Sequence, residues 1–144
     1  MKNNIFCVRV NYDLSVEKAV KAGKYYWKDD DITDKNFPPK RSGSAEIDIQ
    51  LVNFNKNMSS EDVLKELDKM GLRPAELPEL LVLGTKYPNE QKRYPIIALG
   101  SVWRDLDGDC YVPFLFGGGS ERELYLIYLG HGLSACCRFA TVGK

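Results

Sequence analysis

The chain has 144 residues, and its 20 basic and 20 acidic side chains cancel to a formal net charge of zero. This length corresponds to one domain, and a neutral chain lacks the electrostatic footprint of a nucleic-acid binder and the basic patch that anionic lipid attracts. The sequence has no apolar run of about 18 residues, so we expect no membrane insertion. The opening apolar stretch is too short for a secretory signal, which favours a cytoplasmic location.

The first strand and the first helix are expected before residue 24. Apolar and polar residues alternate in NIFCVRV, which predicts a strand over residues 4–10 with Phe6, Val8 and Val10 on one face. SVEKAVKAG then has a helical pattern, with Ser15 as the N-cap and Gly23 at the end.

Residues 24–44 show little periodicity and predict a long loop. Its acidic residues Asp29, Asp30, Asp31 and Asp34 are candidate calcium ligands. They lack the D-x-D-x-D-G spacing of an EF-hand, however, which favours a solvated loop.

A second strand and two helices are expected next. SAEIDIQLVNF alternates and predicts a strand with its apolar residues on one face. SSEDVLKELDKMG has a serine cap, an acidic first turn and apolar residues at helical spacing, and Gly71 ends it. LPELLVLGTKYP predicts another helix, with Pro78 in its first turn and Gly84 near its end.

From Pro95 onwards the sequence is rich in β-branched and aromatic residues. PIIALGSVW, CYVPFLF, ELYLIYL and CCRFATV are strand-like runs, separated by the turn-like segments DLDGD, GGGSER and GHGLSA. This spacing is typical of an antiparallel sheet. The predicted fold class is therefore α+β, in a single domain over residues 1–144, with a helical scaffold over 1–94 and a β-rich module over 95–144.

Familiar catalytic patterns are absent from the sequence. It has no G-x-x-x-x-G-K-[ST] loop, no G-x-S-x-G elbow and no H-E-x-x-H pair. A zinc site would require Cys110, His131, Cys136 and Cys137 to converge. We expect ordinary reduced thiols, no metal, no cofactor and no catalysis. The alternative is a small enzyme or thiol-dependent protein that uses Cys137 and His131.

The segment between Cys110 and Cys137 is poor in charge. Its only charged residues are Glu121, Arg122 and Glu123, although 28% of the whole chain is charged. Because neighbouring residues on a strand face opposite ways, a domain of this size cannot easily bury every face of these strands. An exposed patch rich in tyrosine is typical of a binding surface. A sheet buried on both faces, or a structural subunit that buries these strands against another copy, is the alternative.

PIIALGSVWRDLDGD and the closing CRFATV resemble segments of the variable proteins of diversity-generating retroelements, which have the C-type lectin fold. In that family a glycine-serine-tryptophan segment leads into a hypervariable stretch, and a strand containing arginine and phenylalanine closes the domain. The matching residues are Gly100, Ser101, Trp103, Arg138 and Phe139. The match departs from the family pattern in two places, because Val102 separates serine from tryptophan and CRF stands where GFR is common. It covers residues 95–144, and residues 57–94 resemble the scaffold of similar proteins.

The resemblance implies an origin for the charge-poor segment. The retroelement mutates adenines in asparagine codons, which gives access to residues such as tyrosine, phenylalanine, leucine, histidine and isoleucine but not to lysine, glutamine, glutamate, methionine or tryptophan. From Cys110 to Cys137 the chain has no lysine, glutamine, methionine or tryptophan, so only Glu121 and Glu123 need to be fixed positions. The implied fold is C-type-lectin-like, with short helices packed on small antiparallel sheets and with the N- and C-terminal strands paired.

The predicted function is binding of an unidentified ligand, expected to be a protein, through a hypervariable surface without catalysis. The residues expected to contact the ligand are Tyr111, Phe114, Phe116, Tyr125, Ile127, His131, Leu133 and Ser134. The expected framework residues are Trp103, Val112, Leu115, Leu124, Leu126, Arg138 and Phe139. Lectin ancestry requires neither sugar nor calcium, because a fold does not determine a function.

Overall fold

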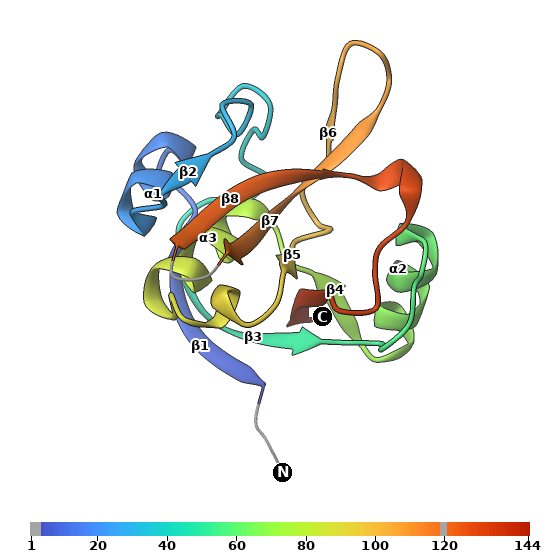
Figure 1. The fold of residues 1–144 in the computed structure, drawn as a ribbon. Helices are drawn as coiled ribbons and strands as arrows, with labels where there is room; N and C mark the ends of the chain where they lie inside the picture. Colours follow the sequence, from blue (N-terminus) through green and yellow to red (C-terminus); the bar gives the residue numbers. More distant parts are fainter. Residues whose placement is uncertain (1–3, 119–120) are drawn as a thin grey trace.

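The computed structural model describes residues 4–118 and 121–144, within which three helices accompany one nine-stranded mixed sheet (Figure 1). The strand order is β1-β3-β9-β5-β7-β8-β2, with β4 beside β9 and β6 beside β7. This is the predicted α+β class. The elements in chain order are β1 (Ile5–Asn11), α1 (Val16–Gly23), β2 (Trp27–Lys28), β3 (Ser44–Val52), α2 (Ser60–Lys69), β4 (Leu72–Pro74), α3 (Leu77–Lys86), η1 (Glu90–Lys92), β5 (Ile96–Ile97), β6 (Trp103–Arg104), β7 (Cys110–Gly118), β8 (Glu121–Tyr128), η2 (Leu129–His131) and β9 (Arg138–Gly143).

The helices begin where their capping residues predict. Ser15 Oγ accepts a hydrogen bond from the Lys18 N–H, and Ser59 Oγ accepts one from the Asp62 N–H. Helix α1 ends at Gly23 as expected, and Lys24 after it takes the left-handed conformation, with φ of 54°. None of the helices in the described part of the chain combines the length and the apolar character needed to cross a bilayer.

Two expectations about the sheet are wrong. The N- and C-terminal strands do not pair, because β3 lies between them: Phe6 of β1 faces Ile49, and Ile49 faces Val142 of β9. The physical reason is that the nine-residue β3 uses both of its edges. The sheet is also a single mixed sheet instead of small antiparallel ones, since β5 runs parallel to β9 and β2 runs parallel to β8.

The segment from residue 24 to 44 is anchored instead of solvated. It contributes the short strand β2, and Ile32 and Phe37 are buried in the core. Strand β4 is a second element that periodicity did not predict, because three residues are too short to show a pattern. At the expected GGGSER turn, residues 119 and 120 lie outside the described residues, and Gly118 pairs with Glu121 on either side of them.

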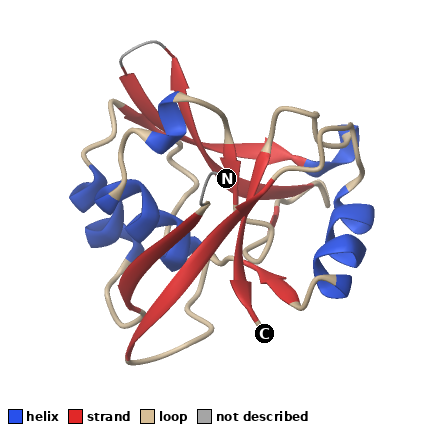
Figure 2. Cartoon of the chain, turned by 90° about the horizontal axis from the view of Figure 1, so that it is seen from below, coloured by secondary structure: helices blue, strands red, loops and turns tan. Residues whose placement is uncertain are grey.

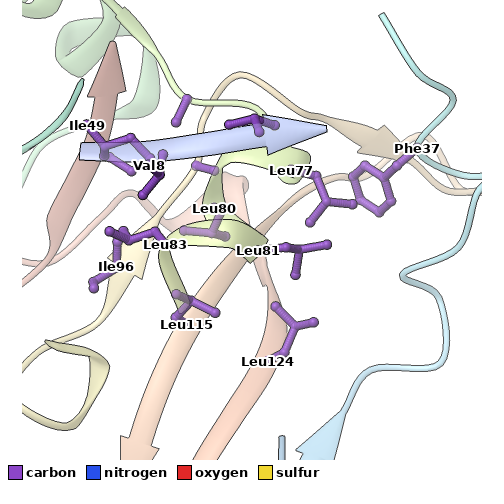
Figure 3. Packing of buried hydrophobic residues seen from close by; sticks show 14 of the residues in the cluster. Val8, Phe37, Ile49, Leu77, Leu80, Leu81, Leu83, Ile96, Leu115 and Leu124 are labelled. Atoms are coloured by element: carbon purple, nitrogen blue, oxygen red, sulfur yellow. The ribbon is translucent and has the colours of Figure 1, made fainter. Parts of the chain in front are cut away.

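Two hydrophobic cores flank the sheet. Helices α1 and α3 cover one side, and Figure 3 shows the leucines of α3 facing side chains from β1, β3, β5, β7 and β8. Helix α2 lies on the other side (Figure 2), where Val63 and Leu67 pack against the second core. Because Val112 and Leu115 of β7 are both fully buried but in different cores, the middle of this strand is fixed from both faces.

Candidate ligand-binding surface

The register of β7 and β8 decides which side chains share a face. Directly opposed residues in an antiparallel pair lie on the same face, and successive residues alternate between faces. Phe114 is opposite Tyr125, and Leu115 is opposite Leu124. One face therefore carries Val112, Phe114, Phe116, Glu123, Tyr125 and Ile127, and the other carries Tyr111, Pro113, Leu115, Leu124, Leu126 and Tyr128.

Four rings gather on the first of these faces, and we call Trp27, Phe114, Phe116 and Tyr125 the aromatic face. The ring centroids of Tyr125 lie 4.6 Å from Trp27, 5.7 Å from Phe114 and 6.3 Å from Phe116. Trp27 is 44% exposed and Phe116 37% exposed, while Phe114 and Tyr125 are half-buried. Rings that contact one another yet remain accessible offer a large, preorganised contact area.

Tyr125 presents a neutral hydroxyl at this face. Its O–H donates to Glu123 Oε1 over 2.8 Å. This hydrogen bond raises the pKa of Tyr125 above its ordinary value, with further contributions from desolvation and from the charge of Glu123. The phenol therefore stays protonated at neutral pH.

Strand β2 and Arg122 hold the aromatic face in place. The N–H groups of Tyr26 and Asp29 donate to the carbonyls of Arg122 and Leu124, at 2.8 and 2.9 Å. The Arg122 guanidinium donates to the Gly23 and Gly84 carbonyls, which ties β8 to the ends of α1 and α3. Sequence reasoning missed Trp27 because it lies in a segment without periodicity, and it treated Arg122 only as a charge near a turn.

The predicted contact residues do not form one patch. Tyr111 lies on the opposite face of the hairpin from Phe114 and Tyr125, and its ring contacts that of Tyr128 at 5.6 Å. His131 is exposed and joins this second group, with its ring 4.9 Å from Tyr128. The reason is strand alternation: odd and even positions of β7 cannot share a face.

Three other residues predicted to contact the ligand also lie away from the aromatic face or are too buried to be contacted. Leu133 is only 2% exposed, packs in the second core and forms a β-bridge with Met58, so its assignment to the contact surface is wrong. Ile127 is half-buried against the same core. Ser134 is exposed beside Cys136, with Oγ and Sγ 3.1 Å apart, in the loop before β9.

The expected framework residues are either buried in the two cores or half-buried. Four of them are buried, and these are Val112, Leu115, Leu124 and Phe139. Trp103 and Leu126 are half-buried, and the Arg138 guanidinium stacks over the Tyr94 ring at 4.2 Å. The positions immediately around the aromatic face are therefore fixed by packing.

The thiols do not form the pair that a nucleophilic mechanism uses. All four cysteines are free, and the buried Cys137 Sγ lies 3.4 Å from Ser134 Oγ. Among the described residues no hydrogen bond joins Cys137 to His131, whose ring packs on Tyr128 instead. Nucleophilic catalysis needs a base within hydrogen-bond reach, so this arrangement does not favour the alternative enzyme.

Acidic residues gather in the turn between β6 and β7. Carboxylate oxygens of Asp105, Asp107 and Asp109 lie within 4.8 Å of one another. Asp105 Oδ1 already accepts the N–H groups of Asp107 and Asp109, which stabilises the turn. Sequence reasoning read DLDGD only as a turn, although aspartates at every second position were a signal for this cluster.

A cavity of about 750 Å³ lies between residues 12–16, the loop over 34–42 and the start of α3. Most of its polar groups already have protein partners. Ser101 Oγ accepts the Leu77 N–H at 2.7 Å, and Lys40 Nζ donates to the Gly100 carbonyl at 2.8 Å. A ligand would therefore find few unpaired polar groups there, which makes this cavity a weaker candidate than the aromatic face.

A buried ion network adjoins that cavity through Tyr12. The fully buried Glu79 carboxylate accepts from Arg73 Nη2 at 2.7 Å and from the Tyr12 O–H at 2.6 Å. Burial alone raises the pKa of Glu79, but the hydrogen bonds from Arg73, Tyr12 and the Glu76 N–H outweigh it and lower the pKa. Burial and the bond to Glu79 raise the pKa of Tyr12 to about 12. Because each charge in this network has a partner within the protein, we assign the network a structural role.

Comparison with protein families, with curated proteins and with solved structures finds no match to this chain. Its function is therefore inferred from the chemistry and geometry of its own residues.

Proposed function

We propose that the protein is a non-catalytic ligand-binding protein whose contact surface is the aromatic face of β7, β8 and β2, and that this surface is diversified as the resemblance to retroelement variable proteins implies. The observation that carries the proposal is the register of the hairpin. It places Phe114, Phe116 and Tyr125 together on an accessible face, while Leu115 and Leu124 beside them are fully buried. The expected ligand is a protein, because linked aromatic rings with a polar tip suit protein recognition.

A diversified surface needs a backbone that does not depend on the side chains that vary. Strand β7 meets this need because Val112 and Leu115 anchor it in the two cores. Arg122 and the pairing with β2 fix β8 in the same way. The variable positions consistent with this geometry are Phe114, Phe116 and Tyr125, with Trp27 as a constant neighbour that adenine mutation does not reach.

Substitution on the aromatic face should leave the fold intact. We expect Tyr125→Ser and Phe116→Ser each to lower the free energy of unfolding by about 1 kcal/mol or less, because both rings are accessible and their removal leaves no closed cavity. Thermal melts measure this, and sedimentation of the same samples measures the oligomeric state. If either variant dissociates an oligomer that the parent protein forms, the face buries against another copy and the structural-subunit alternative is correct.

Diversification has a direct genetic test. We expect a near-copy of the sequence coding for residues 110–137 close to a reverse-transcriptase gene, with differences confined to adenines of the copy. Deep sequencing of the gene from a growing population should show substitutions at codons 114, 116 and 125. Codons 112, 115 and 124, which specify buried residues, should stay constant. Substitutions spread evenly over both sets would refute diversification while leaving ligand binding to be judged by the variants above.

A further inference from the structure

The outer edge of β8 is only partly covered. Carbonyls of Arg122 and Leu124 point away from β7 and accept the N–H groups of Tyr26 and Asp29. Since backbone groups alternate along a strand, the N–H and C=O of Leu126 and the N–H of Tyr128 point to the same edge. Strand β2 is much shorter than β8 (Figure 1) and pairs only with Glu123 and Leu124. Within the described residues, no strand pairs with this edge of β8 beyond Leu124.

A small acidic and aromatic pocket opens beside this uncovered edge. Its volume is about 190 Å³, and it is lined by Asp29, Asp31, Trp103, Asp105, Tyr111 and Leu126. The rings of Trp103 and Tyr111 lie 5.6 Å apart and form one wall. Desolvation, followed by the charges of Asp105 and Asp109, raises the pKa of Tyr111, so the ring stays neutral beside a negative potential.

Each part of this site selects a ligand of the same kind. The backbone groups of Leu126 and Tyr128 at this edge pair with no strand among the described residues. Such groups bind an extended peptide, which adds a strand to the sheet by β-augmentation. Carboxylates beside aromatic rings attract a cation, through charge and through cation–π contact. The pocket is smaller than the roughly 300–1,000 Å³ typical of sites for drug-sized ligands, so it suits a single side chain.

We propose that an extended basic peptide of a partner protein adds a strand to β8 at Leu126 and places a lysine or arginine side chain in the pocket formed by Asp29, Asp31, Asp105, Trp103 and Tyr111. This site shares β8 with the aromatic face but uses none of its side chains. It therefore does not depend on the function proposed above.

The probe is the peptide acetyl-TVKVT-amide, titrated into the ¹⁵N-labelled full chain and followed by NMR. Binding should shift the amide signals of Leu126 and Tyr128 and slow their exchange with water. The same peptide N-methylated at the lysine and at both valines loses every central backbone donor in either strand direction, and it should bind at least tenfold more weakly. Acetyl-TVEVT-amide should give no shift, because glutamate meets the negative pocket.

Protein variants test the two halves of the site. Asp31→Asn should weaken binding about fivefold at low salt, since the Asp31 carboxylate is exposed and has no hydrogen-bond donor in the described structure. Asp48→Asn is the matched control, because Asp48 is an exposed aspartate on the distant strand β3 and should leave binding unchanged. Phe116→Ser should also leave it unchanged, which separates this site from the aromatic face.

Three results would overturn the proposal. Equal shifts with acetyl-lysine methylamide would show that the edge contributes nothing. Loss of peptide binding in Phe116→Ser but not in Asp31→Asn would place the peptide on the aromatic face. Shifts at Asp105 and Asp107 with calcium, without any shift from the basic peptide, would make the pocket a cation site.

Discussion

Glu79→Gln is expected to lower the free energy of unfolding by about 3 kcal/mol, because it removes the 2.7 Å ion pair with the Arg73 guanidinium in a largely buried position and leaves Arg73 only its 3.9 Å contact with Glu76. The Glu79 side chain is fully buried and the Arg73 side chain is only 20% exposed, so water cannot replace the lost ion pair. Tyr12→Phe removes just the 2.6 Å hydrogen bond to the same carboxylate and should cost less, about 1.5 kcal/mol. Urea unfolding of both variants measures the two effects.

The matched control for this prediction is Glu46→Gln. Glu46 also pairs with an arginine, Arg9, but the Glu46 side chain is 70% exposed and the Arg9 side chain 69% exposed. An exposed pair contributes about 0.2–1 kcal/mol, so the control variant should unfold nearly as the parent does. Equal losses of unfolding free energy at Glu46 and Glu79 would contradict the claim that burial makes the Glu79 ion pair costly to break.

The same network predicts how stability depends on acid. The folded-state pKa of Glu79 lies below its ordinary value of 4.5, so the folded protein binds this proton less readily than the unfolded chain does. The stabilisation from Glu79 is therefore complete above pH 4.5 and is lost as the pH falls through the lower, folded-state pKa. Glu79→Gln lacks this titration, and its stability should fall less steeply below pH 4.5. A slope identical to that of the parent would contradict the assignment.

Local signals in the sequence predicted the secondary structure well. The Ser15 and Ser59 caps lie where the helices begin, and β1 and β3 show the predicted alternation of exposed and buried residues. The order of strands was not predictable in this way. Pairing of β3 with both β1 and β9 depends on contacts between residues far apart in the chain, and these leave no periodic trace. Strand β2 was not predictable for the same reason, because its two residues form a strand only by pairing with β8.

The candidate site was predicted in composition but not in arrangement. Charge depletion and aromatic content predicted accessible rings on β7 and β8, and the structure has Phe116 exposed and Phe114 and Tyr125 half-buried there. Alternation alone should have separated Tyr111 from Phe114, since three residues apart on a strand means opposite faces. Burial of Leu133 was beyond the sequence, because it depends on the bridge that the loop before β9 makes with Met58. Trp27 was missed for the same kind of reason, being brought in by a long-range pairing.

Phe139→Ala is expected to cost about 3–5 kcal/mol of unfolding free energy, the range for removing a buried phenylalanine side chain. Phe139 is 4% exposed, packs in the second core and pairs with Val52 and Ile97 on its two neighbouring strands. Strand β9 is held on both sides by the sheet, so its backbone cannot shift to close the space that the ring leaves.

Phe116→Ala deletes the same atoms from a residue that is 37% exposed on the aromatic face, which makes it the matched comparison. It should cost about 1 kcal/mol or less, since much of the ring already contacts water and no closed cavity is left behind. Trp103, another of the expected framework residues, is half-buried, so the cost of its truncation should fall between the two. Denaturant midpoints for the three variants rank them directly. If Phe116→Ala unfolds the protein as readily as Phe139→Ala does, the rings of β7 and β8 belong to the core. The face would then be part of the scaffold, and its aromatic residues would not be free to vary or to bind.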